Sequence, residues 1–219
     1  MSVKNILHFN NYEKVLVNDN HNIPTVVLTR GKETYIGYQA YENAQSMDEV
    51  NTNFKVEVGY YDRNNFTKDY QTIKTADNKY ISAMKLVELF FNQVLPQTTS
   101  YIESNSFSKC KNLMIAEPLS ILQKEDIDNR WLANYRRNLK GYFSLKGYEN
   151  ISFLPEPFAV FQYYKYCKKF APLTSGEQIV ALVIDFGGGT FDTCIIETSK
   201  EGDIREREEF EASWSFLNS

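Results

Sequence analysis

The sequence predicts an α/β fold in which short strands alternate with helices. Apolar residues recur at helical spacing over residues 81–94 and again over 125–139, which predicts two amphipathic helices between strands. Two β-rich apolar runs, at residues 179–184 and 193–196, flank a glycine turn and predict a hairpin. Strands mixed with crossover helices are typical of α/β architecture.

Short strands are predicted through the first third of the chain, where apolar and polar residues alternate between turn residues. The expected strands are residues 3–9, 14–17, 25–29, 34–36, 54–60 and 70–74. The turn between the third and fourth contains Gly31, and residues 39–45 predict a short helix. In the strand expected at 54–60, apolar Phe54, Val56 and Val58 alternate with charged neighbours.

Longer elements are predicted in the remainder. The first amphipathic helix is expected to end near Val94, because Pro96 follows it, and a polar linker is expected at residues 97–109. The second is expected to turn Trp131, Leu132 and Tyr135 inward. The other expected elements are a buried strand at 112–116, a strand at 151–154, a helix at 157–170 opened by its proline, and a last strand near 207–214.

Composition excludes several classes of protein. The chain has 219 residues, 42% of them hydrophobic, and a net charge of −4, so it is globular with no bias toward nucleic acid. Cys110, Cys167 and Cys194 form no C-x-x-C pair, which predicts free thiols in a reducing compartment. No run has the form of a signal peptide or the length of a membrane span, so a cytoplasmic location is expected.

The most specific motif is Asp-Phe-Gly-Gly-Gly-Thr-Phe-Asp at residues 185–192. Gly187, Gly188 and Gly189 allow positive φ and bring backbone N–H groups close to a ligand. Successive N–H groups of this kind form an anion-binding nest, and the flanking Asp185 and Asp192 suit a hydrated Mg²⁺. The motif therefore predicts a nucleotide phosphate site.

Three other interpretations account for less of the motif. A purely structural turn explains the glycines, but it gives no reason for Asp185, Thr190 and Asp192 together. A dinucleotide fingerprint requires a helix after the glycines, whereas residues 190–198 alternate as a strand does. A protein kinase requires an H-R-D loop, and the only histidines are His8 and His21.

The motif resembles the second phosphate loop of the DnaK-type (70-kDa heat-shock) chaperones of the actin-like ATPase superfamily. Four other places are similar to that family in order and spacing: residues 19–27 with 35–37, 51–55 with Gly59, 112–118, and 153–157 with its Glu156-Pro157. The resemblance implies lobe I of the actin-like (ribonuclease H-like) fold with a subdomain IB insertion, plus the first strands of lobe II. Its parts would be subdomain IA (1–24 and 100–172), subdomain IB (25–99) and the start of subdomain IIA (178–219).

The resemblance also implies roles for single residues. Lys55 would orient the attacking water and stabilise charge on the γ-phosphate; alternatively it is a solvated lysine on a strand edge. Glu156 and Asp185 would hold Mg²⁺ through water and help place the nucleophile, and a helix-start carboxylate meeting the macrodipole is the other interpretation of Glu156.

The remaining roles belong to the loop itself and to one proline. Thr190 and the amides of Gly187, Gly188 and Gly189 would contact phosphate. Asp192 would act on the metal through water, or it caps the turn. Pro118 would be the family's switch proline, or it simply ends a strand.

The implied cofactors are ATP or ADP with Mg²⁺, and the implied parent is an ATP hydrolase that couples hydrolysis to binding of client polypeptides, with a J-domain co-chaperone and a nucleotide exchange factor as partners. Neither nucleic acid nor a membrane is an expected partner. The family's first phosphate loop would precede the strand around His8, and its adenosine pocket would follow Ser219, so weak or absent ATP binding is expected of this segment.

By the same resemblance, a central sheet without the family's first strand would have an unpaired edge, and the last three strands would have an uncovered apolar face. This predicts a homodimer, a segment swap or a repacking of the C-terminal strands. Two alternatives stay open: an interaction module that keeps the fold without hydrolysis, and a relative of the sugar or acetate kinases.

Overall fold

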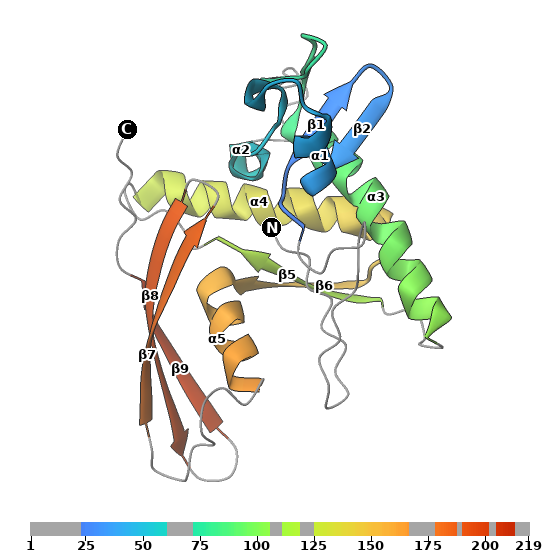
Figure 1. Cartoon of the computed structure of the whole chain (residues 1–219). Helices are drawn as coiled ribbons and strands as arrows, with labels where there is room; N and C mark the ends of the chain where they lie inside the picture. Colours follow the sequence, from blue (N-terminus) through green and yellow to red (C-terminus); the bar gives the residue numbers. More distant parts are fainter. Residues whose placement is uncertain are drawn as a thin grey trace. The chain divides into compact units, whose positions relative to one another are not determined.

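The structure is a computed structural model that describes residues 23–60, 72–105, 111–118, 125–166, 178–187, 190–201 and 205–212. Helices and small sheets are mixed along the chain, as the α/β prediction requires (Figure 1). The chain divides into two compact units: unit 1 comprises Met1–Ile115 and Asn129–Ser152, and unit 2 comprises Ala116–Asp128 and Phe153–Ser219. The strands predicted at 3–9 and 14–17 lie outside the described residues, as do Cys110 and Cys167.

Unit 1 contains the predicted hairpin, with β1 (Val27–Arg30) antiparallel to β2 (Glu33–Ile36). Its turn uses Gly31 at φ 62°, a left-handed conformation that glycine adopts at little cost. The short helix α1 (Tyr38–Asn43) follows, which confirms that prediction, and the 3-10 turn η1 (Met47–Glu49) comes next. Arg30 Nη2 donates to Glu49 Oε2 at 2.6 Å and ties the hairpin to that turn.

Two short strands follow residues 61–71, which lie outside the described residues. β3 (Ile73–Lys74) pairs antiparallel with β4 (Tyr80–Ile81), which confirms the last two residues of the strand predicted at 70–74; residues 70 and 71 lie outside the described residues. The turn between them is closed by Thr75, whose Oγ1 donates to Asp77 Oδ1 at 2.7 Å and accepts from the Lys79 N–H at 3.0 Å. The Lys79 ammonium and the Thr75 hydroxyl lower the pKa of the Asp77 carboxyl to about 2.

The strand predicted at residues 54–60 is wrong: this segment is the helix α2 (Phe54–Tyr60). Phe54 and Val58 lie four residues apart and are both buried, so the apolar residues fit a helical face as well as an alternating one. Side chains from far along the chain satisfy its carbonyls. Trp131 Nε1 donates to the Val56 carbonyl at 2.9 Å, and Asn138 Nδ2 donates to the Val58 carbonyl at 2.9 Å.

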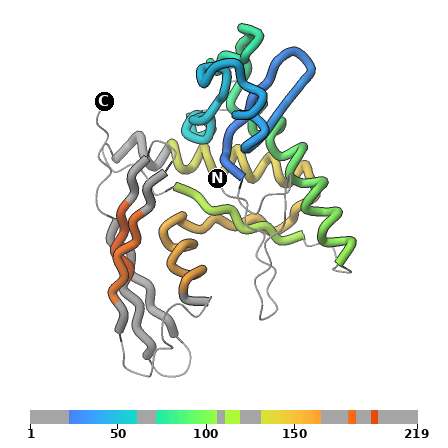
Figure 2. Tube along the Cα trace, viewed as in Figure 1, coloured from blue at the N-terminus to red at the C-terminus, as the bar shows by residue number. Residues whose placement is uncertain are grey.

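The next helix, α3 (Ala83–Ser104), is longer than predicted and continues through Pro96 (green in Figure 2). It begins as capping rules require, with Ser82 Oγ accepting from the Lys85 N–H at 3.2 Å. Proline removes one helical hydrogen bond, but Val94 and Thr98 keep the buried face continuous across it. The linker predicted at 97–109 is therefore helical as far as Ser104.

Aromatic side chains from α3 and α4 (Glu125–Leu145) form the core of unit 1. The Phe91 and Phe143 rings meet edge to face with centroids 4.8 Å apart, and Trp131 stacks on Tyr135 at 5.2 Å. The predicted burial of Trp131 and Tyr135 is confirmed, whereas Leu132 is only half-buried. α4 also extends past the predicted end of the helix at residue 139.

β5 (Asn112–Glu117) and β6 (Asn150–Pro155) lie side by side as a two-stranded sheet. Asn150 Nδ2 donates to Asn112 Oδ1 at 2.8 Å, and Ser152 Oγ donates to the Leu113 carbonyl at 3.5 Å. Because the partner numbers rise together, the strands run parallel, as their arrows do in Figure 1. The buried strand predicted at 112–116 is wrong in one respect, since Asn112 and Met114 are exposed and the strand alternates.

Unit 2 is built from α5 (Glu156–Tyr166) and the antiparallel meander β7 (Gln178–Gly187), β8 (Thr190–Glu201) and β9 (Arg205–Ala212). The predicted helix is confirmed as far as Tyr166, and its last residues lie outside the description. Phe158 and Phe161 of α5 pack on one face of the meander, against Val183, Cys194 and Ile196. The other face exposes the apolar side chains of Val180, Leu182, Ile184 and Ile195.

No helix in the described part of the chain is both long enough and apolar enough to cross a membrane.

Candidate functional site

The predicted phosphate loop lies between two paired strands. Asp185 is the register partner of Asp192, and Gly187 is the partner of Thr190, so β7 and β8 stay paired up to the glycine turn. This confirms the predicted strand–turn–strand. Gly188 and Gly189 lie outside the described residues, and of Asp185, Thr190 and Asp192 only the backbone is described.

The register also assigns the two acidic positions to a face of the sheet. Side chains alternate along a strand, so positions 185 and 183 share a face, as do 192 and 194. Val183 and Cys194 are buried against α5. Positions 185 and 192 therefore belong to the α5-covered face of the meander.

Glu156 is the first residue of α5 and follows Pro155, the last residue of β6, directly. It is half-buried. A carboxylate in the first turn of a helix is stabilised by the macrodipole, so this interpretation of Glu156 stays as open as the metal-binding one. Within unit 2, the helix that Glu156 begins is the one that covers the face of positions 185 and 192.

Glu117, the last residue of β5, is a further acidic residue near the start of α5 along the sheet edge, and sequence reasoning did not single it out. It ends β5 with 1% of its surface exposed. Glutamate is almost never this deeply buried unless it is paired. Because β5 and β6 are parallel neighbours, Glu117 and Glu156 leave the sheet at the same, carboxyl edge. The available signal was an acid closing an apolar run directly before Pro118.

Pro118 follows the last residue of β5 and is half-buried. That position suits a proline that ends a strand, because its ring removes the N–H that a ladder would need. Its predicted role as a switch stays a prediction.

Lys55 belongs to unit 1, on α2 rather than on the predicted strand. It is half-buried and borders a cavity of about 10 Å³ whose walls include Phe54, Val58 and Tyr135. A cavity of that size holds at most one water molecule, so the phosphate that Lys55 was predicted to stabilise does not fit inside it. Its catalytic role stays a prediction.

No group of three or more His, Cys, Asp or Glu side chains suited to a metal occurs where the structure describes side chains, a part of the chain that omits those of Asp185 and Asp192. Mg²⁺ is commonly bound by one or two carboxylates, with water and substrate phosphates completing its shell. Glu117 and Glu156, at the carboxyl edge of β5 and β6, are residues of the type that this requirement names.

Cys194 is the one cysteine that the structure describes, and it is buried in the α5–meander core as a free thiol. Burial raises the pKa of this thiol, which keeps it protonated and unreactive.

No protein-family model matches the chain, and no curated protein matches it.

Proposed function

We propose that the chain carries the phosphate- and Mg²⁺-binding part of an ATP-binding domain of the DnaK-like chaperone type, with the actin-like ATPase fold. The parent protein would couple ATP hydrolysis to the binding of client polypeptides. The observation that carries the proposal is the glycine turn closing a long hairpin, with Asp185 and Asp192 as register partners and Gly187 opposite Thr190.

The surrounding fold supports this function. In α/β proteins, ligands bind outside the carboxyl ends of parallel strands. Glu117 and Glu156 stand at that edge of β5 and β6. The helix that starts at Glu156 packs on the sheet face to which positions 185 and 192 belong. Carboxylates and backbone N–H groups are the donor set that a nucleotide phosphate with Mg²⁺ requires.

Such a site would act by positioning the phosphate groups, the metal and the attacking water. The glycine amides and the Thr190 hydroxyl would bind phosphate oxygens, while Asp185 and Glu156 would hold the waters of a bound Mg²⁺, with Asp192 behind them. The metal, when bound, neutralises charge on the β- and γ-phosphates. Lys55 would act on the γ-phosphate and the attacking water. Little covalent chemistry is asked of the protein in phosphoryl transfer.

The test is phosphorus NMR of Mg·ATP with increasing amounts of the chain. The γ- and β-phosphate resonances should shift or broaden, and Asp185→Asn and Thr190→Val should each reduce the effect at least about tenfold. Asp185→Asn removes the negative charge that would hold the waters of Mg²⁺, and Thr190→Val removes a hydroxyl donor to a charged phosphate oxygen. Thr198→Val is the matched control, since it changes the same residue type farther along β8 and should leave the titration unchanged. Phosphate resonances that respond to Asp185→Asn and Thr190→Val as they do to the unmodified chain would refute the proposal.

The uncovered face of the meander favours a second candidate function, an interaction module that uses the fold without hydrolysis. Val180, Leu182, Ile184 and Ile195 form an apolar surface there, and contiguous surfaces of this kind mark interaction sites. Sedimentation velocity distinguishes the two candidates. Self-association that is lost in Leu182→Lys and indifferent to Mg·ATP would favour the interaction module.

A further inference from the structure

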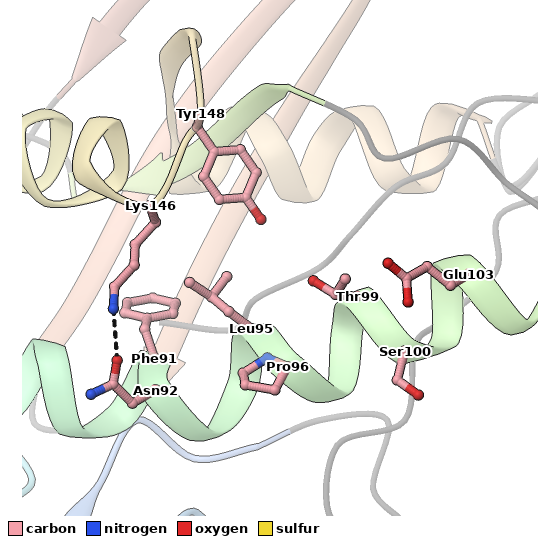
Figure 3. Close-up of a pocket in the computed structure, with 9 residues that line it drawn as sticks. All are labelled: Phe91, Asn92, Leu95, Pro96, Thr99, Ser100, Glu103, Lys146 and Tyr148. Carbon is pink, nitrogen blue, oxygen red and sulfur yellow. Dashed lines mark hydrogen bonds between the residues drawn. The ribbon is translucent and has the colours of Figure 1, made fainter.

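Unit 1 contains a groove of about 460 Å³ whose residues have no part in the proposed phosphate site. One wall is the side of α3 from Phe91 to Glu103, and the other is formed by Lys146 and Tyr148, which follow the end of α4 (Figure 3). The volume is in the range of sites that bind small molecules and short peptides. The charges and the apolar surface of the groove indicate which kind of ligand fits it.

The groove has opposite charges at its two ends. Lys146 Nζ donates to Asn92 Oδ1 at 2.9 Å and lies 5.4 Å from the centroid of the Tyr142 ring, so the ammonium is held in place. An ammonium has three N–H donors, and this hydrogen bond uses one of them. Glu103 is exposed at the other end, and none of the ion pairs between described residues includes it.

The distance between these charges follows from the helix. Glu103 lies eleven residues after Asn92, the partner of Lys146, and at 1.5 Å per residue this is about 16 Å. An extended polypeptide advances about 3.3 Å per residue, so about five residues span the groove.

The floor between the charges combines apolar surface with hydrogen-bonding groups. Phe91, Leu95 and Tyr148 supply the apolar part. Pro96 has no N–H, so the Asn92 carbonyl lacks its usual helical donor at the edge of the groove. The hydroxyl groups of Thr99 and Ser100 follow along the same wall. A bound backbone could use these groups for its own N–H and C=O groups.

We propose that this groove binds a short extended peptide segment of about five residues, with an acidic side chain at Lys146, a basic side chain at Glu103 and an apolar residue between them. The separation of the two charges sets the length of the peptide, and the direction in which the peptide lies is what the test decides. A nucleic acid fits poorly, because Glu103 would repel its phosphates.

The test uses three blocked, fluorescein-labelled pentapeptides and fluorescence anisotropy with the full chain. Asp-Ala-Leu-Ala-Arg and Arg-Ala-Leu-Ala-Asp carry the charges at the ends in the two directions. Asp-Arg-Ala-Leu-Ala has the same composition with adjacent charges. One of the two end-charged peptides should bind at least about fivefold more tightly than the charge-adjacent isomer, because only the former reaches both Lys146 and Glu103.

Variants then assign the binding to the groove. Glu103→Gln and Lys146→Met should each weaken the preferred peptide about two- to fivefold, the effect expected of exposed ion pairs. Glu88→Gln is the matched control, because Glu88 lies on the same helix and pairs with Lys85 outside the groove. The double variant Glu103→Lys with Lys146→Glu should exchange the preference between the two end-charged peptides.

Three results would overturn the inference. The first is that the charge-adjacent peptide binds as tightly as the others. The second is that Glu88→Gln weakens binding as much as Glu103→Gln. The third is that no peptide raises the anisotropy at protein concentrations up to about 1 mM, which would place the Kd above that value. Circular dichroism of each variant, compared with the unmodified chain, shows whether folding has been preserved.

Discussion

The helical core of unit 1 and the meander of unit 2 use apolar residues in opposite ways. Around α2, α3 and α4, large side chains such as Phe90 and Tyr135 are enclosed from all sides. In the meander, one face packs on α5, while Leu182 and Ile184 on the other face are 63% and 56% exposed. Both regions are rich in apolar residues, so composition alone does not distinguish them.

This difference in burial indicates which interactions stabilise each region. In the core of unit 1, large apolar side chains are fully enclosed. Side chains from far along the chain also hydrogen-bond to backbone carbonyls, as those of Trp131 and Asn138 do in α2. In unit 2, the antiparallel ladders hold the sheet, and α5 together with Leu154 of β6 supplies the apolar contacts on one face. Substitutions should therefore be costly throughout the core of unit 1 and costly on only one face of the meander.

The largest effect is expected for Gly59→Ala in unit 1. A Cβ at this position would lie 2.2 Å from the Trp131 ring, which is buried and hydrogen-bonded to the Val56 carbonyl. We expect a loss of about 3 kcal/mol in the free energy of unfolding, measured by urea denaturation with tryptophan fluorescence. Glu57→Ala on the same helix is the control and should change stability by less than about 0.5 kcal/mol. Equal stabilities of the two variants would contradict the tight packing of α2 on α4.

The next effect compares adjacent residues of β7. Val183→Ala should cost about 2 kcal/mol, because it opens a space in the α5–meander core. Leu182→Ala removes a side chain from the exposed face and should cost less than about 0.5 kcal/mol. Urea unfolding followed by far-ultraviolet circular dichroism measures both. A Leu182→Ala cost as large as that of Val183→Ala would mean that the outer face is covered in solution.

The smallest effect is the pH dependence of the free energy of unfolding that results from burial of Tyr142 in the core of unit 1. Burial, then the charge of Glu88, raises the pKa of Tyr142 from 10 to about 12. Between these values the unfolded chain has lost the tyrosine proton and the folded chain keeps it, so stability falls as the pH rises. At pH 11 the loss should be about 1.4 kcal/mol relative to pH 9.

Tyr142→Phe is the control for that measurement, since other tyrosines titrate in the same range. Its free energy of unfolding should lack this component of the alkaline loss. The Tyr142 hydroxyl has no hydrogen-bond partner among the described residues, so the variant should be at least as stable as the unmodified chain at neutral pH. A variant with the same alkaline loss as the unmodified chain would place the titration elsewhere.

Local patterns in the sequence predicted much of the fold. The β1–β2 hairpin, α1, α5 and the glycine hairpin all depend on residues close together in the chain, and their turns or caps were visible. The strand predicted at 54–60 failed because three alternating apolar residues fit both periods, and its helical state depends on Trp131 and Asn138. The end of α3 was predicted too early, at Pro96. This proline lies on the exposed side of the helix, and the free energy lost with its missing hydrogen bond is smaller than the free energy gained by burying the opposite face.

In the candidate site, too, features that depend on neighbouring residues were predicted, and features that depend on distant segments were not. The sequence predicted that Asp185 and Asp192 lie at the two ends of a turn between strands, and the structure adds that they are register partners. Glu117 was missed because its proximity to the Glu156 edge depends on two strands separated by the whole of α4. The groove between α3 and Tyr148 was also beyond sequence reasoning, because the predicted end of α3 removed one of its walls.

The dependence of α2 on α4 has a consequence for the order in which the protein is made. A seven-residue helix is too short to be stable in isolation. The side chains that bind its carbonyls lie 75 and 80 residues farther along the chain. On the ribosome, α2 therefore waits as an unstructured segment until residue 138 has left the exit tunnel, and during that interval Phe54 and Val58 are accessible to any chaperone that recognises apolar nascent chains.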